Sequence, residues 1–523
     1  MTGHVFVIQG DIRRFACDAY LYATDRDLRD GGGWMESAPG APGRINPQRR
    51  ADFKAEKSFT LALTDRRGRL NEPATILTAV PYDGVKHLEE FAPRLQAFFA
   101  EAFEISKRRG ATAAVSKRDR PLLAVPLFGV GGGGAGSVRG KMFRVVYREA
   151  LAAAAHYNVD VAIVLRDPRD YALAQMIRRE GRDAWPELTP ELHASARELG
   201  EIAAESKLVP FMGAGISLSA GAPDWKSLIN RLAMDAGVEP EVRRELAKHD
   251  VLDQAAYVQY ALERRTGADK AAFGRIVADA VNVKRYGIAP PLLAALEAEQ
   301  AITLNYDRLF EWAAGDGQRP RRVIPGARGD EERWLLKLHG TVDDPASIVL
   351  TREDYLGFNA DRAALSSLVK ATLMTRHLLF VGFGVTDPHF HEIVHDVRRA
   401  VPDKGQPFGT VLTIGHDPVK RGLWGDDLKF VEVDTPRMVD VFLDAVLAYG
   451  ASSHSYLLAK GYLSTLDPED RIVAEALGKM IDSIPEADRR GTAWDAVAVG
   501  LRDLGWGARV EKRSRSALPK GLD

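Results

Sequence analysis

The sequence predicts an α/β protein made of two strand-and-helix domains followed by a helical C-terminal extension. Short apolar runs alternate with amphipathic helical patterns up to about residue 450, and a chain of 523 residues is too long for one hydrophobic core. A polar stretch punctuated by prolines, at 182–192, interrupts this alternation. The expected domains are therefore 1–185, 186–450 and 451–523.

The first domain is predicted from apolar runs that are nearly continuous, as in strands covered on both faces. These runs are residues 4–10, 18–24, 74–80, 121–128 and 159–165. Two helical faces lie between them, one with Leu88, Phe91, Leu95 and Phe98, the other with Met142, Val145, Val146 and Leu151.

The second domain opens at Thr189 and Pro190, which have the pattern of a helix N-cap followed by a first-turn proline. No convincing strand occurs between 224 and 298, so a helical insertion is expected there. Six strands are predicted near 207–212, 300–304, 334–339, 377–383, 409–415 and 428–433. Asp467 and Pro468 mark the start of a helix in the extension.

Composition excludes several classes of function. Lys and Arg number 71 against 72 for Asp and Glu, so no net charge favours nucleic acid or an anionic membrane. No apolar stretch has membrane-spanning length and the start lacks a signal-peptide pattern, so a cytoplasmic protein is expected. Cys17 is the single cysteine, which excludes disulfides and Cys-based zinc sites, and no metal is expected.

The stretch LVPFMGAGIS, 208–217, combines a buried-strand pattern with a glycine turn. Gly213, Ala214 and Gly215 allow a tight turn, and a helix is expected to begin at Asp224 or shortly before. Unpaired backbone N–H groups and the positive end of a helix dipole suit a diphosphate. Leu218 replaces the last glycine of the dinucleotide fingerprint, so the turn taken alone is as consistent with a purely structural role.

Three further strand ends carry polar or glycine-rich motifs. They are TLNYD at 303–307, LKLHG at 336–340 and FVGFGVTDP at 380–388. Ligands of parallel sheets bind outside the carboxyl ends of the strands, so the four motifs are expected to share one site. As an ordered set over about 200–450, they resemble the sirtuin family. This resemblance implies a Rossmann-like domain that binds NAD.

The resemblance also implies roles for individual residues. Asn305 would hold the nicotinamide ribose or the attacking water, Asp307 would lie on the carboxamide side, and His339 would be the general base. The diphosphate and ribose would contact Gly213, Ala214, Gly215 and Ser217, and the adenosine side Gly382, Gly384 and Asp387. Gly384 stands where many sirtuins have serine.

Three histidines, His389, His391 and His395, follow the last of these motifs. The second and third lie one helical turn apart, a spacing that suits a metal pair. Because the chain has a single cysteine and no H-E-x-x-H pattern, a solvated helix face is the preferred interpretation.

The expected reaction depends on how the chain departs from protein deacylases. A deacylating sirtuin usually holds a zinc module with four cysteines, which this chain cannot build, and Ala222, Pro223, Asp224 and Trp225 replace its usual segment after GAGIS. GAPDWKSLI and TLNYDRLFE resemble prokaryotic sirtuin-like NAD hydrolases of antiphage defence. The expected products are nicotinamide and ADP-ribose, with or without some cyclic product. A protein deacylase, an ADP-ribosyltransferase and a silent nucleotide sensor stay as alternatives.

The first domain resembles a macrodomain, on the stretch VFVIQGDIRRFACDAYLYATD. By this resemblance Asp11 would face an adenine, and two glycine loops would follow a diphosphate. The loop residues are Gly31, Gly32, Gly33, Gly131, Gly132, Gly133 and Gly134. A flexible surface loop is an equally good interpretation of the second run alone. The hydrolase is expected to be gated by this domain, through binding of an ADP-ribose-like nucleotide, or by a partner. A homo-oligomer or a complex with a defence partner protein is expected.

Overall fold

A computed structural model divides the chain into two compact units. Unit 1 comprises residues 1–187 and 451–523, and unit 2 comprises 188–450. The structure describes residues 2–28, 41–64, 72–80, 87–109, 118–131, 135–181, 184–267, 269–401 and 405–508. Within these residues no helix combines the length and the apolar character that a membrane span needs.

Unit 1 contains a six-stranded mixed sheet whose strand order is β1-β6-β5-β2-β4-β3. The strands are β1 (Val5–Gln9), β2 (Ala19–Thr24), β3 (Thr60–Ala62), β4 (Ala74–Ala79), β5 (Leu122–Pro126) and β6 (Asp160–Leu165). All pairs are parallel except β3 with β4. The five predicted strands are confirmed. The sequence missed β3, because three residues are too few for a periodic pattern.

The described α-helices of unit 1 before residue 187 are α2 (Pro47–Lys54), α3 (Ala92–Arg109), α4 (Arg139–Tyr157) and α5 (Pro168–Glu180). Helix α3 packs on β2 to β5, while α4 and α5 pack on β1 and β6. The predicted buried faces are confirmed except at Leu88, which is partly exposed, and at Leu151, which is 45% exposed. Leu151 lies nine residues after Met142, and at about 100° per residue this places it on the opposite face of the helix.

The residues after 450 complete unit 1 rather than forming a separate body. The Tyr462 hydroxyl donates to Oδ1 of the buried Asp170 at 2.7 Å, and Arg139 Nε donates to the same oxygen at 2.8 Å. The backbone N–H of Arg139 donates to the Gly461 carbonyl at 3.2 Å. Further along lie α17 (Pro468–Ser483) and α18 (Thr492–Asp503), and Asp467 caps α17 as predicted. This segment therefore supplies partners that α4 and α5 need.

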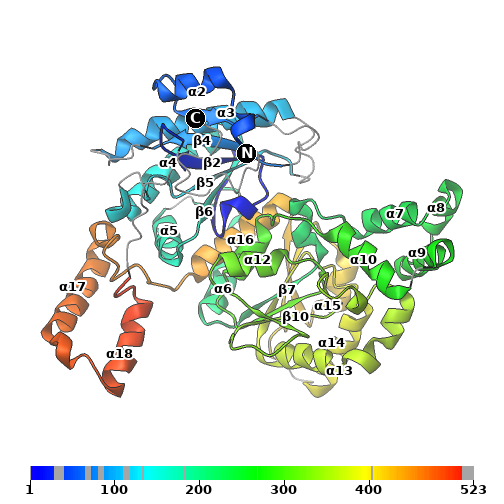
Figure 1. Ribbon diagram of the computed structural model, residues 1–523. Coiled ribbons are helices and arrows are strands. Elements are labelled where there is room, and N and C mark those ends of the chain that lie inside the picture. The colour runs from blue at the N-terminus through cyan, green and yellow to red at the C-terminus, as the bar shows by residue number, and fades with distance from the viewer. Residues whose placement is uncertain are drawn as a thin grey trace. The chain divides into compact units, whose positions relative to one another are not determined.

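Unit 2 is built on a seven-stranded parallel sheet, ordered β13-β12-β11-β7-β8-β10-β9 (Figure 1). Its strands are β7 (Leu208–Met212), β8 (Gln300–Thr303), β9 (Arg322–Ile324), β10 (Trp334–Lys337), β11 (His377–Val381), β12 (Gly409–Ile414) and β13 (Leu428–Val433). The six predicted strands are confirmed, and the three-residue edge strand β9 was missed. Strand order reverses at β7, whose neighbours are β8 and β11.

Helices cover both sides of this sheet (Figure 1). On one side α6 (Pro190–Ala204) packs along α16 (Pro436–Gly450), and Thr189 caps α6 as predicted. On the other, α13 (Arg352–Thr375) and α14 (Pro388–Ala400) bury an apolar core against the strands. Burial of such side chains contributes about 1.5–3 kcal/mol for each one. The Rossmann-like arrangement predicted for this region is confirmed.

The predicted helical insertion is confirmed between β7 and β8. It comprises α7 (Trp225–Asp235), α8 (Pro240–Leu246), α9 (Val251–Thr266), α10 (Lys270–Val281) and α11 (Ala289–Ala294). Helices α7 to α10 share a core that includes Leu232, Val258 and Val277. Tyr306, from the TLNYD motif, packs into the same core, and its hydroxyl donates to the Val349 carbonyl at 2.7 Å. The insertion is thereby anchored to the residue between Asn305 and Asp307.

Candidate functional site

The four motif-bearing strands end in one row across the middle of the sheet of unit 2. Val381 of β11 is paired with Met212 of β7, Met212 with Thr303 of β8, and Thr303 with Lys337 of β10. Every predicted site residue of this unit follows its strand by one to six positions. The expectation that the four motifs share one edge is therefore confirmed by the register.

Asn305 and His339 occupy equivalent positions at this edge. Each lies two residues beyond the paired residues Thr303 and Lys337. The Leu338 N–H donates to the Thr303 carbonyl at 3.0 Å, which continues the pairing past the strand ends. Neighbouring strands are about 4.8 Å apart, so the register brings the two motifs into one small region.

The turns that follow the neighbouring strands β7 and β11 are in direct backbone contact at their glycines, a place called the β7–β11 crossing. A Cβ on Gly213 would lie 2.4 Å from the Gly382 carbonyl oxygen, and one on Gly215 would lie 2.6 Å from the Gly382 Cα. Gly382 itself has φ +64°, and its Cβ would approach the Ile216 backbone nitrogen at 2.6 Å. Gly384 differs, because its nearest neighbour would be the Thr386 side chain at 3.5 Å. Three of the four glycines are thus required by the fold at the crossing itself.

The turn after β7 differs from the expected dipole site in two ways. It forms a 3-10 helix, η6 (Ala214–Ala220), and the N–H groups of Gly213, Gly215 and Ile216 bond to carbonyls of the protein. The longer α7 begins only at Trp225, where the Asp224 carboxylate accepts from the Ser227 N–H. The contact of this helix end with the diphosphate stays a prediction, and Asp224 already occupies one of the N–H groups expected there. Ala214 and Gly215 are exposed, so they are the part of the turn that can meet a ligand.

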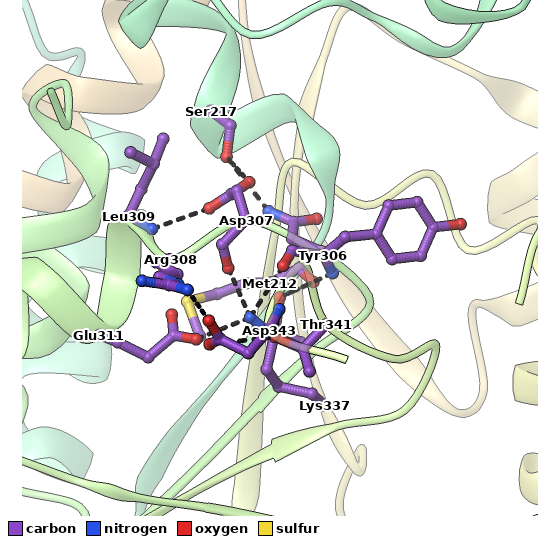
Figure 2. A network of polar contacts seen from close by, with 12 residues as sticks. Met212, Ser217, Tyr306, Asp307, Arg308, Leu309, Glu311, Lys337, Thr341 and Asp343 are labelled. Atoms are coloured by element: carbon purple, nitrogen blue, oxygen red, sulfur yellow. Dashed lines mark hydrogen bonds and ion pairs between the residues drawn. The ribbon is translucent and has the colours of Figure 1, made fainter. Parts of the chain in front are cut away.

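Asn305, Ser217 and Asp307 form one buried polar network. Figure 2 shows the contact between Ser217 and Asp307. The Asn305 amide donates to the Gly213 carbonyl at 3.1 Å and to Ser217 Oγ at 3.3 Å. Ser217 Oγ donates to Asp307 Oδ2 at 2.8 Å, while Asp307 Oδ1 accepts at 2.9 Å from the N–H of Leu309, the first residue of α12 (Leu309–Asp316). Because the Asn305 nitrogen is used in these bonds, its carbonyl oxygen is the end that can orient a water or hydroxyl.

A buried lysine that the sequence analysis did not identify binds the backbone of this network. Lys337 is 1% exposed, and its ammonium donates to the Tyr306 carbonyl at 3.2 Å and to the Asp307 carbonyl (Figure 2). It also pairs with Glu311 at 2.6 Å. Burial raises the pKa of Glu311, although Lys337 opposes that shift. Lys337 therefore fixes the backbone that carries Asn305 and Asp307.

Replacing Lys337 with methionine is expected to cost about 3–5 kcal/mol of unfolding free energy, because Glu311 would stay buried without its partner. Replacing both residues, as Lys337→Met with Glu311→Leu, should recover part of that loss. Arg308→Ala is the matched control, since it breaks an exposed ion pair with Asp343 and should cost about 1 kcal/mol or less (Figure 2). Urea unfolding measures all three, and equal losses for Lys337→Met and Arg308→Ala would contradict this assignment.

His339 lies at the end of β10 in a dry environment. It is 4% exposed, its Nε2 has no hydrogen-bond partner, and the Asp387 carboxylate lies 3.7 Å from that nitrogen. Burial lowers the pKa of His339 to about 4, although Asp387 opposes the shift. The imidazole is therefore neutral at pH 7 and able to accept a proton, and a proton taken up there would be stabilised by the carboxylate.

Asp387, which was expected along the adenosine side, lies against His339. As the N-cap of α14, its Oδ1 accepts from the Phe390 N–H at 3.2 Å. Its Oδ2 accepts from the Tyr355 hydroxyl at 2.8 Å. Capping turns the carboxylate back over the helix start, toward β10. The Asp-Pro sequence signalled the cap, while the residue that it would meet depended on the tertiary fold.

The three histidines of α14 do not share one environment. His391 and His395 are exposed, so the predicted solvated face is correct for them. For His389 that interpretation is wrong, because it is 5% exposed and stacks on Phe358 at 3.7 Å between ring centroids. The signal was available in the helical period, since His389 precedes the buried Ile393 and Val397 by four and eight residues.

Most of the site expected in unit 1 lies outside the described residues. Gly31, Gly32, Gly33, Gly132, Gly133 and Gly134 lie there, and Gly131 is exposed. The carboxylate of Asp11 accepts from the Arg13 guanidinium at 2.7 Å and from the Arg13 N–H at 2.9 Å. It also caps the 3-10 helix η1 (Ile12–Arg14). The position of Asp11 is thus fixed by its own turn, and its predicted contact with adenine stays a prediction.

The class of unit 2 follows from its fold, its strand-end motifs and a family comparison. Residues 299–424 match the family model described as a SIR2-like domain. This stretch contains TLNYD, LKLHG and FVGFGVTDP, while GAGIS precedes it. The chain therefore contains a SIR2-like domain, as the resemblance to sirtuins implied.

Curated relatives narrow the class further. The chain is 27% identical over 210 residues to a protein named NAD(+) hydrolase ThsA from Enterococcus faecium, covering 39% of this chain and 42% of that protein. It is 26% identical over 204 residues to the protein of the same name from Bacillus cereus (strain MSX-D12), covering 38% and 41%. Over 215 residues it is 26% identical to Defense-associated sirtuin 2 of Bacillus subtilis, covering 40% of this chain and 21% of that one. The matches thus span about two fifths or less of these relatives.

Among solved structures, a macrodomain of Oceanobacillus iheyensis with MES bound matches 33% of this chain and 89% of its own length. Its sequence identity is 16% and its TM-score is 0.23. The macrodomain resemblance of the N-terminal residues therefore continues to rest on their sequence motifs.

Proposed function

We propose that unit 2 hydrolyses NAD at the nicotinamide–ribose bond, giving nicotinamide and ADP-ribose. The observation that carries this proposal is that Asn305 and His339 lie at equivalent positions just beyond two adjacent strands. One offers a polar amide and the other a buried, neutral imidazole. The names of the relatives, NAD(+) hydrolase and Defense-associated sirtuin, support the same reaction and a role in antiphage defence by depletion of NAD.

Cleavage of this bond needs positioning more than strong acid–base chemistry. The bond electrons leave with nicotinamide, and the ribose carbon passes through an oxocarbenium-like state that water then attacks. The Asn305 carbonyl oxygen would orient that water, because its amide nitrogen is held by Gly213 and Ser217. His339 Nε2 would accept the proton that the water loses, and Asp387 would stabilise the imidazolium.

The proposed NAD position follows the exposed backbone at the β7–β11 crossing. Ala214, Gly215 and Gly382 are exposed there, and Gly384 has room beside it. Asp307 and Ser217 are held by each other, so they act by fixing Asn305 as well as by any contact with the ligand. Asp387 supports His339 in this arrangement rather than contacting adenosine.

Water is favoured over an acyl-lysine as the nucleophile by the composition of the chain. One cysteine cannot build the zinc module beside which deacylases bind their peptide.

A hydrolase that consumes NAD without restraint would harm its host. We therefore also propose that unit 1 gates the reaction by binding an ADP-ribose-like nucleotide, in a cytoplasmic homo-oligomer or with a defence partner. A silent nucleotide sensor remains the alternative that binding without turnover would support.

Incubating the purified full chain with NAD is expected to release nicotinamide and ADP-ribose in equal amounts, measured by chromatography. Parallel reactions contain an acyl-lysine peptide or added ADP-ribose. Peptide-dependent release would establish a deacylase, and binding of NAD without release in any reaction would establish a sensor. Stimulation by ADP-ribose would support the gate. The full chain is needed because unit 1 includes residues that precede unit 2 in the sequence and residues that follow it.

A further inference from the structure

Three possible metal-ligand atoms converge at the C-terminal end of β10 without a hydrogen bond between them, and their side chains are at most 9% exposed. They belong to His339, Asp387 and His389, and all lie within 4.8 Å of one another. Nε2 of His339 lies 3.7 Å from Asp387 Oδ2, and Nδ1 of His389 lies 4.0 Å from Asp387 Oδ1. These separations are too long for hydrogen bonds, and both nitrogens are buried without a partner.

The hydrogen bonding of His389 fixes which of its nitrogens carries the lone pair. Its Nε2 lies 3.0 Å from the Tyr355 carbonyl oxygen, which can only accept, so Nε2 carries the hydrogen. In the neutral ring Nδ1 then presents a lone pair toward the Asp387 carboxylate. Two electron-rich atoms facing each other in a dry site are unfavourable unless a cation lies between them. Histidines that bind metals commonly donate their other N–H to a carbonyl in this way.

The surrounding residues hold the three groups in place. His389 is stacked between Tyr355 and Phe358, with ring centroids 4.4 Å and 3.7 Å away. The Tyr355 hydroxyl donates to Asp387 Oδ2 at 2.8 Å, as outer-shell partners of a ligating carboxylate do. His339 and His389 face each other nearly at right angles, at 80° between ring planes.

From these observations we propose that His339, Asp387 and His389 bind a divalent transition metal of the zinc class. Ligand atoms about 2.0–2.2 Å from zinc are about 3.3–3.5 Å apart in a tetrahedral site, so the observed distances need to shorten by less than about 1.5 Å. Two imidazoles and one carboxylate are a common set of three protein ligands with a fourth position open. The sequence-based expectation of no metal considered cysteine sites and the cluster of His389, His391 and His395, and it did not bring His389 together with His339 and Asp387.

The inference rests on the proposed function in one respect only. A metal on His339 takes the lone pair that would accept the proton from water, so the bound metal would switch hydrolysis off. Binding itself is independent of NAD turnover. Arg362, which donates to the Leu338 carbonyl beside His339, and the positive end of the α14 dipole both oppose a metal here, while the Asp387 charge favours one.

Calorimetric titration of the metal-free full chain with Zn²⁺ is expected to show one site that requires all three residues. Asp387→Asn and His389→Asn should each weaken binding by about tenfold or more. His395→Asn is the matched control, an exposed histidine of the same helix, and Cys17→Ser controls for thiolate binding. Both should bind like the wild type. No binding to the wild type, or equal binding by Asp387→Asn and His389→Asn, would overturn the proposal.

A spectroscopic measurement on the wild type covers the case in which those variants do not fold. Co²⁺ in place of Zn²⁺ should give the intense visible absorption of a tetrahedral site, and Zn²⁺ should displace it. Absence of that absorption at saturating Co²⁺ would overturn the proposed geometry. Inhibition of nicotinamide release by Zn²⁺, reversed by a chelator, is then expected; a chain that binds Zn²⁺ but never hydrolyses NAD would disprove the hydrolase and leave the metal site intact.

Discussion

Replacing His339 with alanine is expected to lower the rate of nicotinamide release by about two to four powers of ten, the usual contribution of a general base. Asn305→Ala should cause a loss of similar size, because it removes the carbonyl that orients the water. The loss should fall on kcat, since neither side chain is proposed to hold the adenosine or diphosphate of NAD. Steady-state kinetics with NAD measures both effects.

The design of this experiment separates chemistry from folding. His395→Ala removes an exposed histidine of α14 and is the matched control, with activity expected to be unchanged. Thermal unfolding should show that His339→Ala keeps a native unit 2, because the imidazole makes no hydrogen bond through its buried Nε2. Turnover at wild-type rates in both His339→Ala and Asn305→Ala would remove these residues from the mechanism.

The second large effect is expected at the β7–β11 crossing, where the turns that follow these two strands touch. Gly382→Ala places a side chain in left-handed backbone, at about 1–2 kcal/mol, and against the Ile216 nitrogen at 2.6 Å. Overpacking of this kind adds about 1–3 kcal/mol. The combined loss corresponds to a fall of roughly 5–15 °C in the unfolding midpoint of unit 2. Calorimetry or circular dichroism measures it.

Gly384→Ala is the matched control for this substitution. The nearest atom to its Cβ would be the Thr386 hydroxyl at 3.5 Å, which is ordinary contact, so the unfolding midpoint should hardly change. A midpoint loss as large as that of Gly382→Ala would show that the crossing is not what requires glycine. The contrast also explains how a serine fits at this position in related sequences, whereas Gly382 leaves no space for one.

Much of the fold could be read from the sequence because parallel strands buried on both faces leave nearly continuous apolar runs. Only three-residue strands such as β3 and β9 escaped, since so short a run has no period. The shared edge of the four motifs could also be predicted, because alternating strands and helices force every strand of such a sheet to point the same way. This argument grouped GAGIS, TLNYD and LKLHG at one edge, and the resemblance to sirtuins then singled out Asn305 and His339.

The structure changed the reasons given for several of these residues. Gly213 and Gly215 were expected to serve a diphosphate, and they are first required by the Gly382 backbone. The role of Lys337 could not be predicted from LKLHG, because the carbonyls to which its ammonium donates belong to a motif about thirty positions earlier. Residues 451–523 were predicted as a separate extension. In the structure Tyr462 donates a hydrogen bond to Asp170 of α5, and Gly461 accepts one from Arg139 of α4.

The sequence by itself determined the sheet, the order of its motifs and the sirtuin-like character of unit 2, because periodicity and motif order are properties of the chain. Only the tertiary structure decided that Asp387 and His389 turn inward to meet His339. A helix cap fixes the direction of a carboxylate locally, and which residue it meets depends on how α14 is rotated against β10. That rotation is set by burial of Phe390, Ile393 and Val394, a contact between segments distant in the sequence.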